Sequence, residues 1–198
     1  PVVSGNVSFY NGQGEKKIFP TPIIGMVGVL EDLSYLIKPG LKVVGNPLYL
    51  IGDFSWLSLD GSKFIKDIFD KIEGEAPYVD LIWERKLKLF MEEIRKERDI
   101  IVSAHDVSEG GILVTLLEMA FWGNKGVEVS LPSGKVDNLV GEGSGLIIVE
   151  VNKAKEDEYM EFVKKYELRT HKIGEVLERD FIIDPFMKKD ISEFYQRR

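Results

Sequence analysis

The fold class is decided by residues 100–121, which read IIVSAHDVSEGGILVTLLEMAF. The first five of these residues are apolar or small, which predicts a short strand. Residues 110–121 are apolar on nearly every helical face, which predicts a buried helix. A polar turn containing Gly110 and Gly111 separates the two elements. A strand that leads directly into a buried helix indicates a sheet with helices packed against it.

Similar elements recur from residue 47 onward. Short strands are predicted at residues 47–52, 127–131, 146–151, 170–176 and 181–184. An amphipathic helix is predicted at 155–165, a short helix after an N-cap at Ser62, and a last one capped by Asp190. The clearest helix covers 80–98, with a stripe formed by Trp83, Leu87, Phe90 and Ile94 at i, i+4, i+7 and i+11. The many short strands favour an α+β fold with a mixed sheet.

The first part of the chain has a different pattern. Residues 2–9 are rich in β-branched side chains, and residues 23–30 are almost continuously apolar, so both ranges are predicted to be strands. We expect these two strands to pair as a long hairpin around the polar turn at 12–17. Pro39 and Gly40 then mark a turn, and we place a domain boundary near residue 45. The predicted domains are therefore 1–44 and 45–198.

The composition excludes several functional classes. The chain has 198 residues, a formal net charge of -7 and no cysteine. The missing cysteines exclude disulfides, thiolate metal sites and a cysteine nucleophile. The acidic balance argues against nucleic-acid binding. The sequence contains no run of 18 apolar residues, so no membrane span is predicted. The chain opens at Pro1 in the middle of an apparent strand, so we expect it to be a piece of a longer protein.

Residues 5–8, Gly-Asn-Val-Ser, form the first candidate site. A glycine such as Gly5 lets the backbone approach a ligand closely, and the carbonyl of Asn6 is a hard oxygen ligand suited to Mg²⁺. Ser8 lies two residues after Asn6, so in a strand both side chains would point to one face. From spacing alone, a β-bulge with Asn and Ser bonded to nearby backbone is the stronger interpretation.

The second candidate is the turn from Ser103 to Gly111. A polar turn before a helix N-terminus can bind an anion, which makes residues 108–111 (Ser108, Glu109, Gly110 and Gly111) a candidate anion loop. The alternative is a capping box in which Ser108 is the N-cap. His105 invites a role as general base, but a lone histidine at a strand end is more often structural. Residues 141–145 are glycine-rich, lack the pattern of a P-loop and are best interpreted as a flexible turn.

Several segments together carry a resemblance to a known family. PVVSGNVSFYN at 1–11, PTPIIGMVG at 20–28 and SAHDVSEGG at 103–111 occur in this order, and EGEAP at 73–77 is followed by Asp80. Their order and spacing resemble the synthetase subunit of phosphoribosylformylglycinamidine synthases, in the aminoimidazole ribonucleotide synthetase-like superfamily. The resemblance implies that residues 1–44 are the last strands of a barrel-forming N-terminal module. Residues 45–198 would be the following C-terminal α+β module.

The resemblance also implies a reaction. In this family ATP activates the formamide oxygen of formylglycinamide ribonucleotide as an iminophosphate, and ammonia from a glutaminase displaces the phosphate. Gly5 would contact ATP, Asn6 would bind Mg²⁺ and Ser8 would contact the ribonucleotide. The implied partners are the glutaminase subunit, a small accessory subunit and the missing N-terminal part of the chain, in the cytoplasm. No nucleic acid or membrane is implied, and without the family's principal catalytic histidine this piece would not be active alone.

Departures from the family pattern keep alternatives open. Gly12 follows Asn11 where the family commonly has glutamate, and the loops at 60–63 and 141–145 differ from its usual sequences, which argues against anion contacts there. One alternative is a different ATP-using member of the superfamily, such as aminoimidazole ribonucleotide synthetase, a hydrogenase maturation factor or selenophosphate synthetase. The other alternative is a non-catalytic module that holds a structural nucleotide or a subunit interface.

Overall fold

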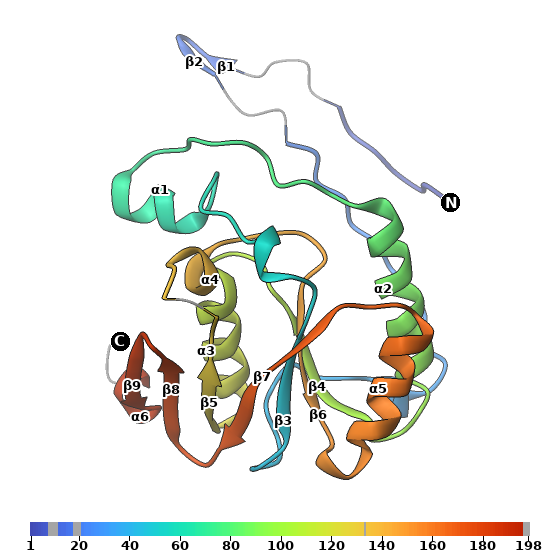
Figure 1. Cartoon of the computed structure of the whole chain (residues 1–198). Coiled ribbons are helices and arrows are strands. Elements are labelled where there is room, and N and C mark those ends of the chain that lie inside the picture. Colours follow the sequence, from blue (N-terminus) through green and yellow to red (C-terminus); the bar gives the residue numbers. More distant parts are fainter. Residues whose placement is uncertain (8–11, 18–20, 133, 196–198) are drawn as a thin grey trace. The chain divides into compact units, whose positions relative to one another are not determined.

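The computed structural model describes residues 1–7, 12–17, 21–132 and 134–195. They form two compact units, Pro1–Glu31 and Asp32–Arg198 (Figure 1). In the first unit, strands β1 (Gly12–Gln13) and β2 (Lys16–Lys17) pair in antiparallel fashion. The described residues of the ranges 2–9 and 23–30 contain no strand, so the predicted long hairpin is wrong. Most of their apolar side chains are almost fully exposed. A stable strand needs neighbouring strands for its backbone hydrogen bonds and other elements that cover its apolar face, and the described residues of this unit provide neither for these ranges.

The second unit contains a mixed seven-stranded sheet, which confirms the predicted α+β class. The strand order is β4-β6-β3-β7-β5-β8-β9, and β5 pairs with β8 in parallel whereas the other described pairs are antiparallel. The strands are β3 (Pro47–Ile51), β4 (Ile101–Asp106), β5 (Gly126–Ser130), β6 (Ile147–Val151), β7 (Thr170–Leu177), β8 (Asp180–Asp184) and β9 (Met187–Asp190). The sequence patterns did not identify β9, because only five residues separate the end of β8 at Asp184 from Asp190.

Helices cover both faces of this sheet (Figure 1). The α-helices are α1 (Lys63–Phe69), α2 (Leu81–Ile94), α3 (Gly111–Gly123), α4 (Asp137–Val140), α5 (Glu156–Lys165) and α6 (Ser192–Tyr195), and the short 3-10 helices are η1 (Leu33–Tyr35), η2 (Phe54–Trp56) and η3 (Lys153–Lys155). Because side chains alternate along a strand, Leu48 and Leu50 join the core beneath α3 and α4, while Tyr49 and Ile51 join the core beneath α2 and α5. In the described part of the chain, no helix has the length and apolar character needed to cross a bilayer.

The helix boundaries follow local signals closely. The four residues predicted as the stripe of α2 are buried, and the Asp80 carboxylate caps that helix by accepting from the N–H groups of Ile82 and Trp83. The Ser62 hydroxyl accepts from Ile65 N–H at 3.3 Å, which confirms the predicted N-cap of α1. Asp190 accepts from Ser192 N–H at 2.8 Å, as predicted for the last short helix. Caps of this kind satisfy amides that have no partner inside the helix.

A buried carboxylate attaches the segment before β3 to the sheet. Glu150 lies in β6 and is fully buried. Its oxygens accept from Lys42 N–H and Val43 N–H, both at 2.9 Å, from Asn46 Nδ2 at 2.8 Å and from Ser103 Oγ at 2.9 Å. The second compact unit therefore begins at Asp32, before the boundary expected near residue 45. The assignment of residues 1–44 to a separate module stays a prediction.

Candidate functional site

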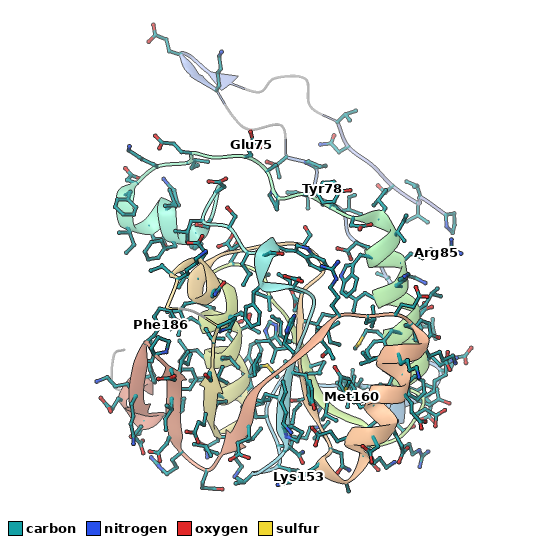
Figure 2. The ribbon with its side chains drawn as sticks, in the orientation of Figure 1. Glu75, Tyr78, Arg85, Lys153, Met160 and Phe186 are labelled. Carbon is teal, nitrogen blue, oxygen red and sulfur yellow. The ribbon has the colours of Figure 1, made fainter. Side chains whose placement is uncertain are left out.

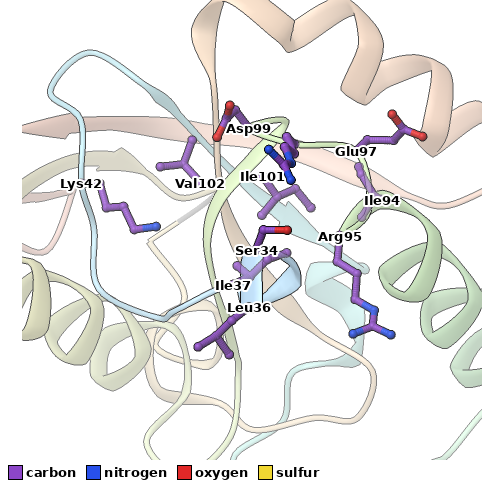
Figure 3. Close-up of a pocket in the computed structure, with 11 residues that line it drawn as sticks. Ser34, Leu36, Ile37, Lys42, Ile94, Arg95, Glu97, Asp99, Ile101 and Val102 are labelled. Carbon is purple, nitrogen blue, oxygen red and sulfur yellow. The ribbon is translucent and has the colours of Figure 1, made fainter. Parts of the chain in front are cut away.

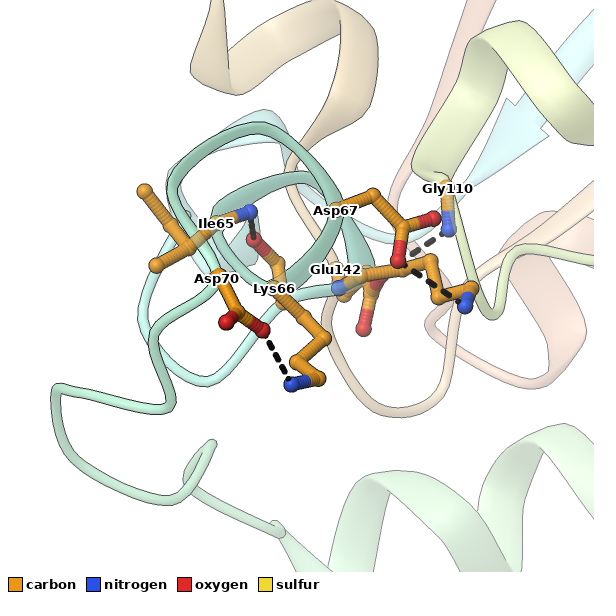
Figure 4. Close-up of polar contacts among 8 residues, drawn as sticks. Ile65, Lys66, Asp67, Asp70, Gly110 and Glu142 are labelled. Atoms are coloured by element: carbon orange, nitrogen blue, oxygen red, sulfur yellow. Dashed lines mark hydrogen bonds and ion pairs between the residues drawn. The ribbon is translucent and has the colours of Figure 1, made fainter.

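Three loops meet around the side chain of Glu142, at the end of the second unit where helices α1 and α3 begin (Figure 4). One Glu142 oxygen accepts from Gly110 N–H at 2.9 Å and from Lys63 N–H at 2.7 Å. The backbone of Glu142 also exchanges two hydrogen bonds with Ser58, of 3.1 and 2.8 Å. A single carboxylate thus joins the N-termini of two helices, where its negative charge is favoured by the helix dipoles.

The turn into α3 depends on its two glycines. Gly110 and Gly111 have φ values of +80° and +66°, in the region that favours glycine. A Cβ on Gly111 would lie 2.4 Å from the carbonyl oxygen of Gly141, so this position also permits a close approach between loops. The N-cap of α3 is Gly110, without a side-chain cap, so the alternative with Ser108 as N-cap is wrong. The left-handed turn moves the N-cap two residues past Ser108, to Gly110.

The candidate anion loop is largely satisfied within the chain. The N–H of Gly110 donates to Glu142, and the N–H of Gly111 donates to the carbonyl of Ser108 at 3.0 Å. An anion at this turn would have to replace the carboxylate of Glu142. The assignment of residues 108–111 to anion binding stays a prediction, and the geometry shows which internal group would compete with the ligand.

A cavity of about 340 Å³ lies beside this junction. Trp56 and Trp83 form part of its wall, with ring centroids 4.9 Å apart and nearly perpendicular planes. The indole N–H of Trp83 donates to the carbonyl of Gly145 at 2.8 Å, which fixes the glycine-rich loop at 141–145 to α2. The segment that connects α1 to α2 lines the cavity through residues 75–78, of which Glu75 and Tyr78 are labelled in Figure 2.

The charge of this cavity limits what it can bind. Its lining residues include the acidic side chains of Asp60, Glu75, Asp80 and Glu84 and no lysine or arginine. A polyphosphate would be repelled here unless cations accompanied it. Arg169 lies beside one wall of the cavity, with its guanidinium 5.6 Å from the centroid of the Trp56 ring and 3.1 Å from Asp53. Hydrogen bonds from Ser55, and then the contact with Arg169, lower the pKa of the Asp53 carboxyl.

His105 is held in a structural arrangement. Its ring stacks on Trp122 with the planes 5° apart, and its Nδ1 lies 2.8 Å from the carbonyl oxygen of Asp106. Its Nε2 lies 3.1 Å from the carboxylate of Glu118. Both ring nitrogens are thus engaged by the chain itself at the edge strand β4. This arrangement agrees with the structural interpretation that the sequence favoured.

The first candidate site belongs to the other compact unit. Gly5 and Asn6 lie in an exposed stretch without regular structure, and Ser8 lies outside the described residues. The argument that Asn6 and Ser8 share one strand face therefore stays a prediction. Across the described ranges, no group of three or more His, Asp or Glu side chains is arranged to hold a metal ion. Asn6 would offer a single oxygen ligand, so the described residues alone do not fit a Mg²⁺ site.

Two glutamates that matter for the architecture were missed by sequence reasoning. Glu150 stands alone in the apolar run LIIVEV at 146–151, and a lone carboxylate inside a buried strand is a signal that it has internal partners. Glu142 gave no such signal, because a glutamate in a glycine-rich loop is usually exposed. Its two amide partners come from segments 79 and 32 residues away in the sequence.

Comparisons with known proteins agree with this fold. Residues 43–184 match the family model described as AIR synthase related protein, C-terminal domain. This chain belongs to that family. The phosphoribosylformylglycinamidine synthase subunit PurL of Carboxydothermus hydrogenoformans is 40% identical over 185 residues, which cover 92% of this chain and 25% of the relative. The PurL subunit of Petrotoga mobilis is 36% identical over 186 residues, which cover 93% of this chain and 25% of the relative.

Solved structures show the same fold. Thermotoga maritima PurL complexed with FGAR superposes with a TM-score of 0.64 at 20% identity, covering 81% of this chain and 29% of that chain. The same protein complexed with ATP gives a TM-score of 0.61 at 18% identity, covering 81% of this chain and 27% of that chain. This chain thus spans about a quarter of the length of the curated relatives it matches.

Proposed function

We propose that this chain is part of a phosphoribosylformylglycinamidine synthase, the ATP-dependent ligase of purine biosynthesis. The observation that carries the proposal is the 40% identity to a PurL subunit over 92% of this chain. Identity at this level over 185 residues is much more specific than any one glycine-rich motif. The shared fold adds support at the level of architecture alone.

In the proposed reaction, the terminal phosphoryl group of ATP passes to the formamide oxygen of formylglycinamide ribonucleotide, and ADP leaves. Ammonia then adds to the carbon of this iminophosphate and phosphate departs, which leaves the amidine. Gly5 would let the backbone approach ATP, and Ser8 would contact the ribonucleotide. Asn6 would provide one oxygen ligand to Mg²⁺, and the other ligands would come from groups outside the described residues.

The proposal includes partners, because this chain spans about a quarter of the length of the PurL relatives it matches. It would work with the rest of its own chain, with a glutaminase subunit that supplies ammonia and with a small accessory subunit, in the cytoplasm. The solved structure of PurLQS from Thermotoga maritima shares the fold of this chain with a TM-score of 0.60. We therefore expect no turnover from this chain alone.

The test is ADP release that depends on formylglycinamide ribonucleotide, with ammonium and Mg-ATP supplied. The chain is mixed with the separately produced N-terminal portion of a PurL parent, and association is checked by gel filtration. We expect turnover that is lost in Asn6→Ala and in Ser8→Ala but retained in Thr21→Ala, an exposed polar residue of the same unit. Associated, folded pieces with intact substrate and no turnover would contradict the proposal.

A second candidate is a module that only holds a structural ligand or a subunit interface. The observation that favours it is the junction at Glu142, where an internal carboxylate already occupies the amide of the candidate anion loop and the adjacent cavity is acidic. In that case Asn6→Ala would leave turnover of the assembled enzyme unchanged. The measured difference would instead be a lower melting temperature of the complex.

A further inference from the structure

A second cavity, of about 430 Å³, lies at the C-terminal end of α2, near edge strand β4 (Figure 3). It is enclosed by the segment before β3, by the last turn of α2 and by the start of β4. Its lining residues are Ser34, Leu36, Ile37, Lys42, Ile94, Arg95, Glu97, Arg98, Asp99, Ile101 and Val102. All of them belong to the second compact unit.

Three cations line this cavity without ion-pair partners. In residues 21–132 and 134–195, no carboxylate oxygen lies within 4.0 Å of the charged nitrogens of Lys42, Arg95 or Arg98. Other lysines of α2 are paired: Lys86 lies 2.6 Å from Glu167 and Lys88 lies 2.7 Å from Glu92. Lys42 and Arg98 are exposed, so water can solvate their charges, whereas Arg95 is half-buried.

Arg95 shows the clearest sign of a missing partner. Its Nε is buried and has no hydrogen-bond partner among the described residues, while the guanidinium carbon lies 5.8 Å from the Tyr35 ring centroid. Cations often lie at a helix C-terminus because the helix dipole favours them there. If Arg95 only stabilised the C-terminus of α2, its Nε would be expected to donate to one of the last carbonyl groups of this helix. Nε makes no such hydrogen bond to the described residues. A buried donor without an acceptor is costly, so an external acceptor is expected.

The carboxylates of Glu97 and Asp99 also line the cavity and reduce its positive charge. The Glu97 side chain is directed away from Lys42 and Ser34 in Figure 3. Asp99 has a φ of +65°, a left-handed conformation that asparagine adopts as readily as aspartate. The lining charges therefore leave an excess of one positive charge, and removal of the Asp99 charge would raise this excess.

We propose that this cavity binds a phosphoryl oxyanion, either as inorganic phosphate or as the phosphate end of a small molecule. Two guanidinium groups offer planar, paired donors that suit the oxygens of phosphate, and Lys42 adds a third positive charge. The side chains of Leu36, Ile37, Ile94, Ile101 and Val102 provide an apolar floor beside these cations. This floor favours a phosphomonoester with an apolar group over phosphate alone. The proposal is independent of the ligase reaction.

The test is isothermal titration calorimetry of this chain with inorganic phosphate and with phenyl phosphate, at low ionic strength. We expect saturable binding of one equivalent, and tighter binding of phenyl phosphate if the natural ligand is an organic phosphate. Equal affinities would support the proposal with inorganic phosphate as the ligand. Arg95→Gln and Arg98→Gln should each weaken binding about tenfold, the size of a lost charge-assisted hydrogen bond.

Two further variants make the result decisive. Arg85→Gln changes an exposed arginine of the same helix, labelled in Figure 2, and should leave the affinity unchanged. Asp99→Asn should strengthen binding severalfold, a gain that misfolding cannot produce. Circular dichroism melts check that each variant is folded. Absence of saturable binding, or equal losses in Arg85→Gln and Arg95→Gln, would overturn the proposal, whatever the outcome of the turnover assay.

Discussion

Two apolar stretches of this chain have similar sequences and opposite environments. Residues 23–30, IIGMVGVL, lie in the first compact unit, where Ile23 is 95% exposed and Val27 fully exposed. Residues 146–151, LIIVEV, contain β6 of the second unit, where Ile148, Val149 and Val151 are fully buried. Both stretches have the composition of a strand buried on both faces, but only the second has β3 and β4 as neighbours.

The difference shows what apolar composition can and cannot determine. Apolar side chains favour burial, but a strand also needs partners for its backbone N–H and C=O groups. β6 obtains these from two antiparallel neighbours and covers each face with helices. Within the first unit, the described residues offer only the two-residue strands β1 and β2 as paired structure. Burial is therefore a property of the assembled sheet and cannot be assigned to one stretch.

The largest expected effect is that of Glu150→Ala, which tests where the folded unit begins. The change leaves four donors without their acceptor, two of them backbone N–H groups of Lys42 and Val43. We expect a loss of about 4 kcal/mol in the free energy of unfolding. The backbone amides of residues 32–46 should exchange their hydrogens faster in this variant. The protected part of the second unit would then begin near residue 47 instead of residue 32. The exposed Glu161 provides the control, since Glu161→Ala should change neither quantity.

Ile148→Ala and Val27→Ala test the comparison directly. Ile148 is fully buried in the core beneath α3, so its truncation should lower the free energy of unfolding by about 3 kcal/mol. Val27 is fully exposed in this structure, so Val27→Ala should cost less than about 0.5 kcal/mol. Urea titration of both variants gives the two values. If they were equal, the contrast between the two stretches would not hold in solution.

Glu142→Ala tests the junction between the helix N-termini. Loss of this carboxylate leaves Lys63 N–H and Gly110 N–H without their acceptor, and we expect a loss of about 1.5 kcal/mol. Glu109→Ala, at an exposed position of the same turn, should change stability by less than about 0.5 kcal/mol. Thermal melts followed by circular dichroism compare the two. Equal melting temperatures would contradict the bridging role of Glu142.

The smallest expected effect concerns acid stability through Glu156. The hydrogen bond from Lys172, followed by that from Tyr49, lowers the pKa of this carboxyl. A carboxyl with a lowered folded-state pKa stabilises the protein above its unfolded pKa of about 4.3, and this stabilisation is lost as the pH falls through the folded value. Glu156→Gln should cost about 0.5 kcal/mol at pH 7, and this cost should shrink as the pH falls through the lowered pKa of the folded state. Glu158→Gln, at an exposed position, should show no such pH dependence in urea titrations.

Sequence-based predictions succeeded where the interacting residues are close in the sequence and failed where they are far apart. The stripe of Trp83, Leu87, Phe90 and Ile94 was predicted residue by residue, because helical periodicity arises within a single element. The caps at Ser62 and Asp190 were predicted because capping bonds span only a few residues. The alternative with Ser108 as N-cap was wrong, because α3 is capped at the left-handed Gly110, whose N–H donates to the distant Glu142. The candidate residues Gly5, Asn6 and Ser8 remain predictions.

The sequence by itself determined most of the longer elements of the second unit, its α+β class and the motifs that resemble the synthetase family, but it did not identify β9 or α4. These depend on periodicity, caps and turns, whose interactions lie within a few residues of each other. Only the tertiary structure decided that Glu150 and Glu142 hold distant segments together and that Lys42, Arg95 and Arg98 face one cavity. The physical reason is that hydrogen bonds and charge clusters depend on distance in space, which the strand order of the sheet sets and no local pattern encodes.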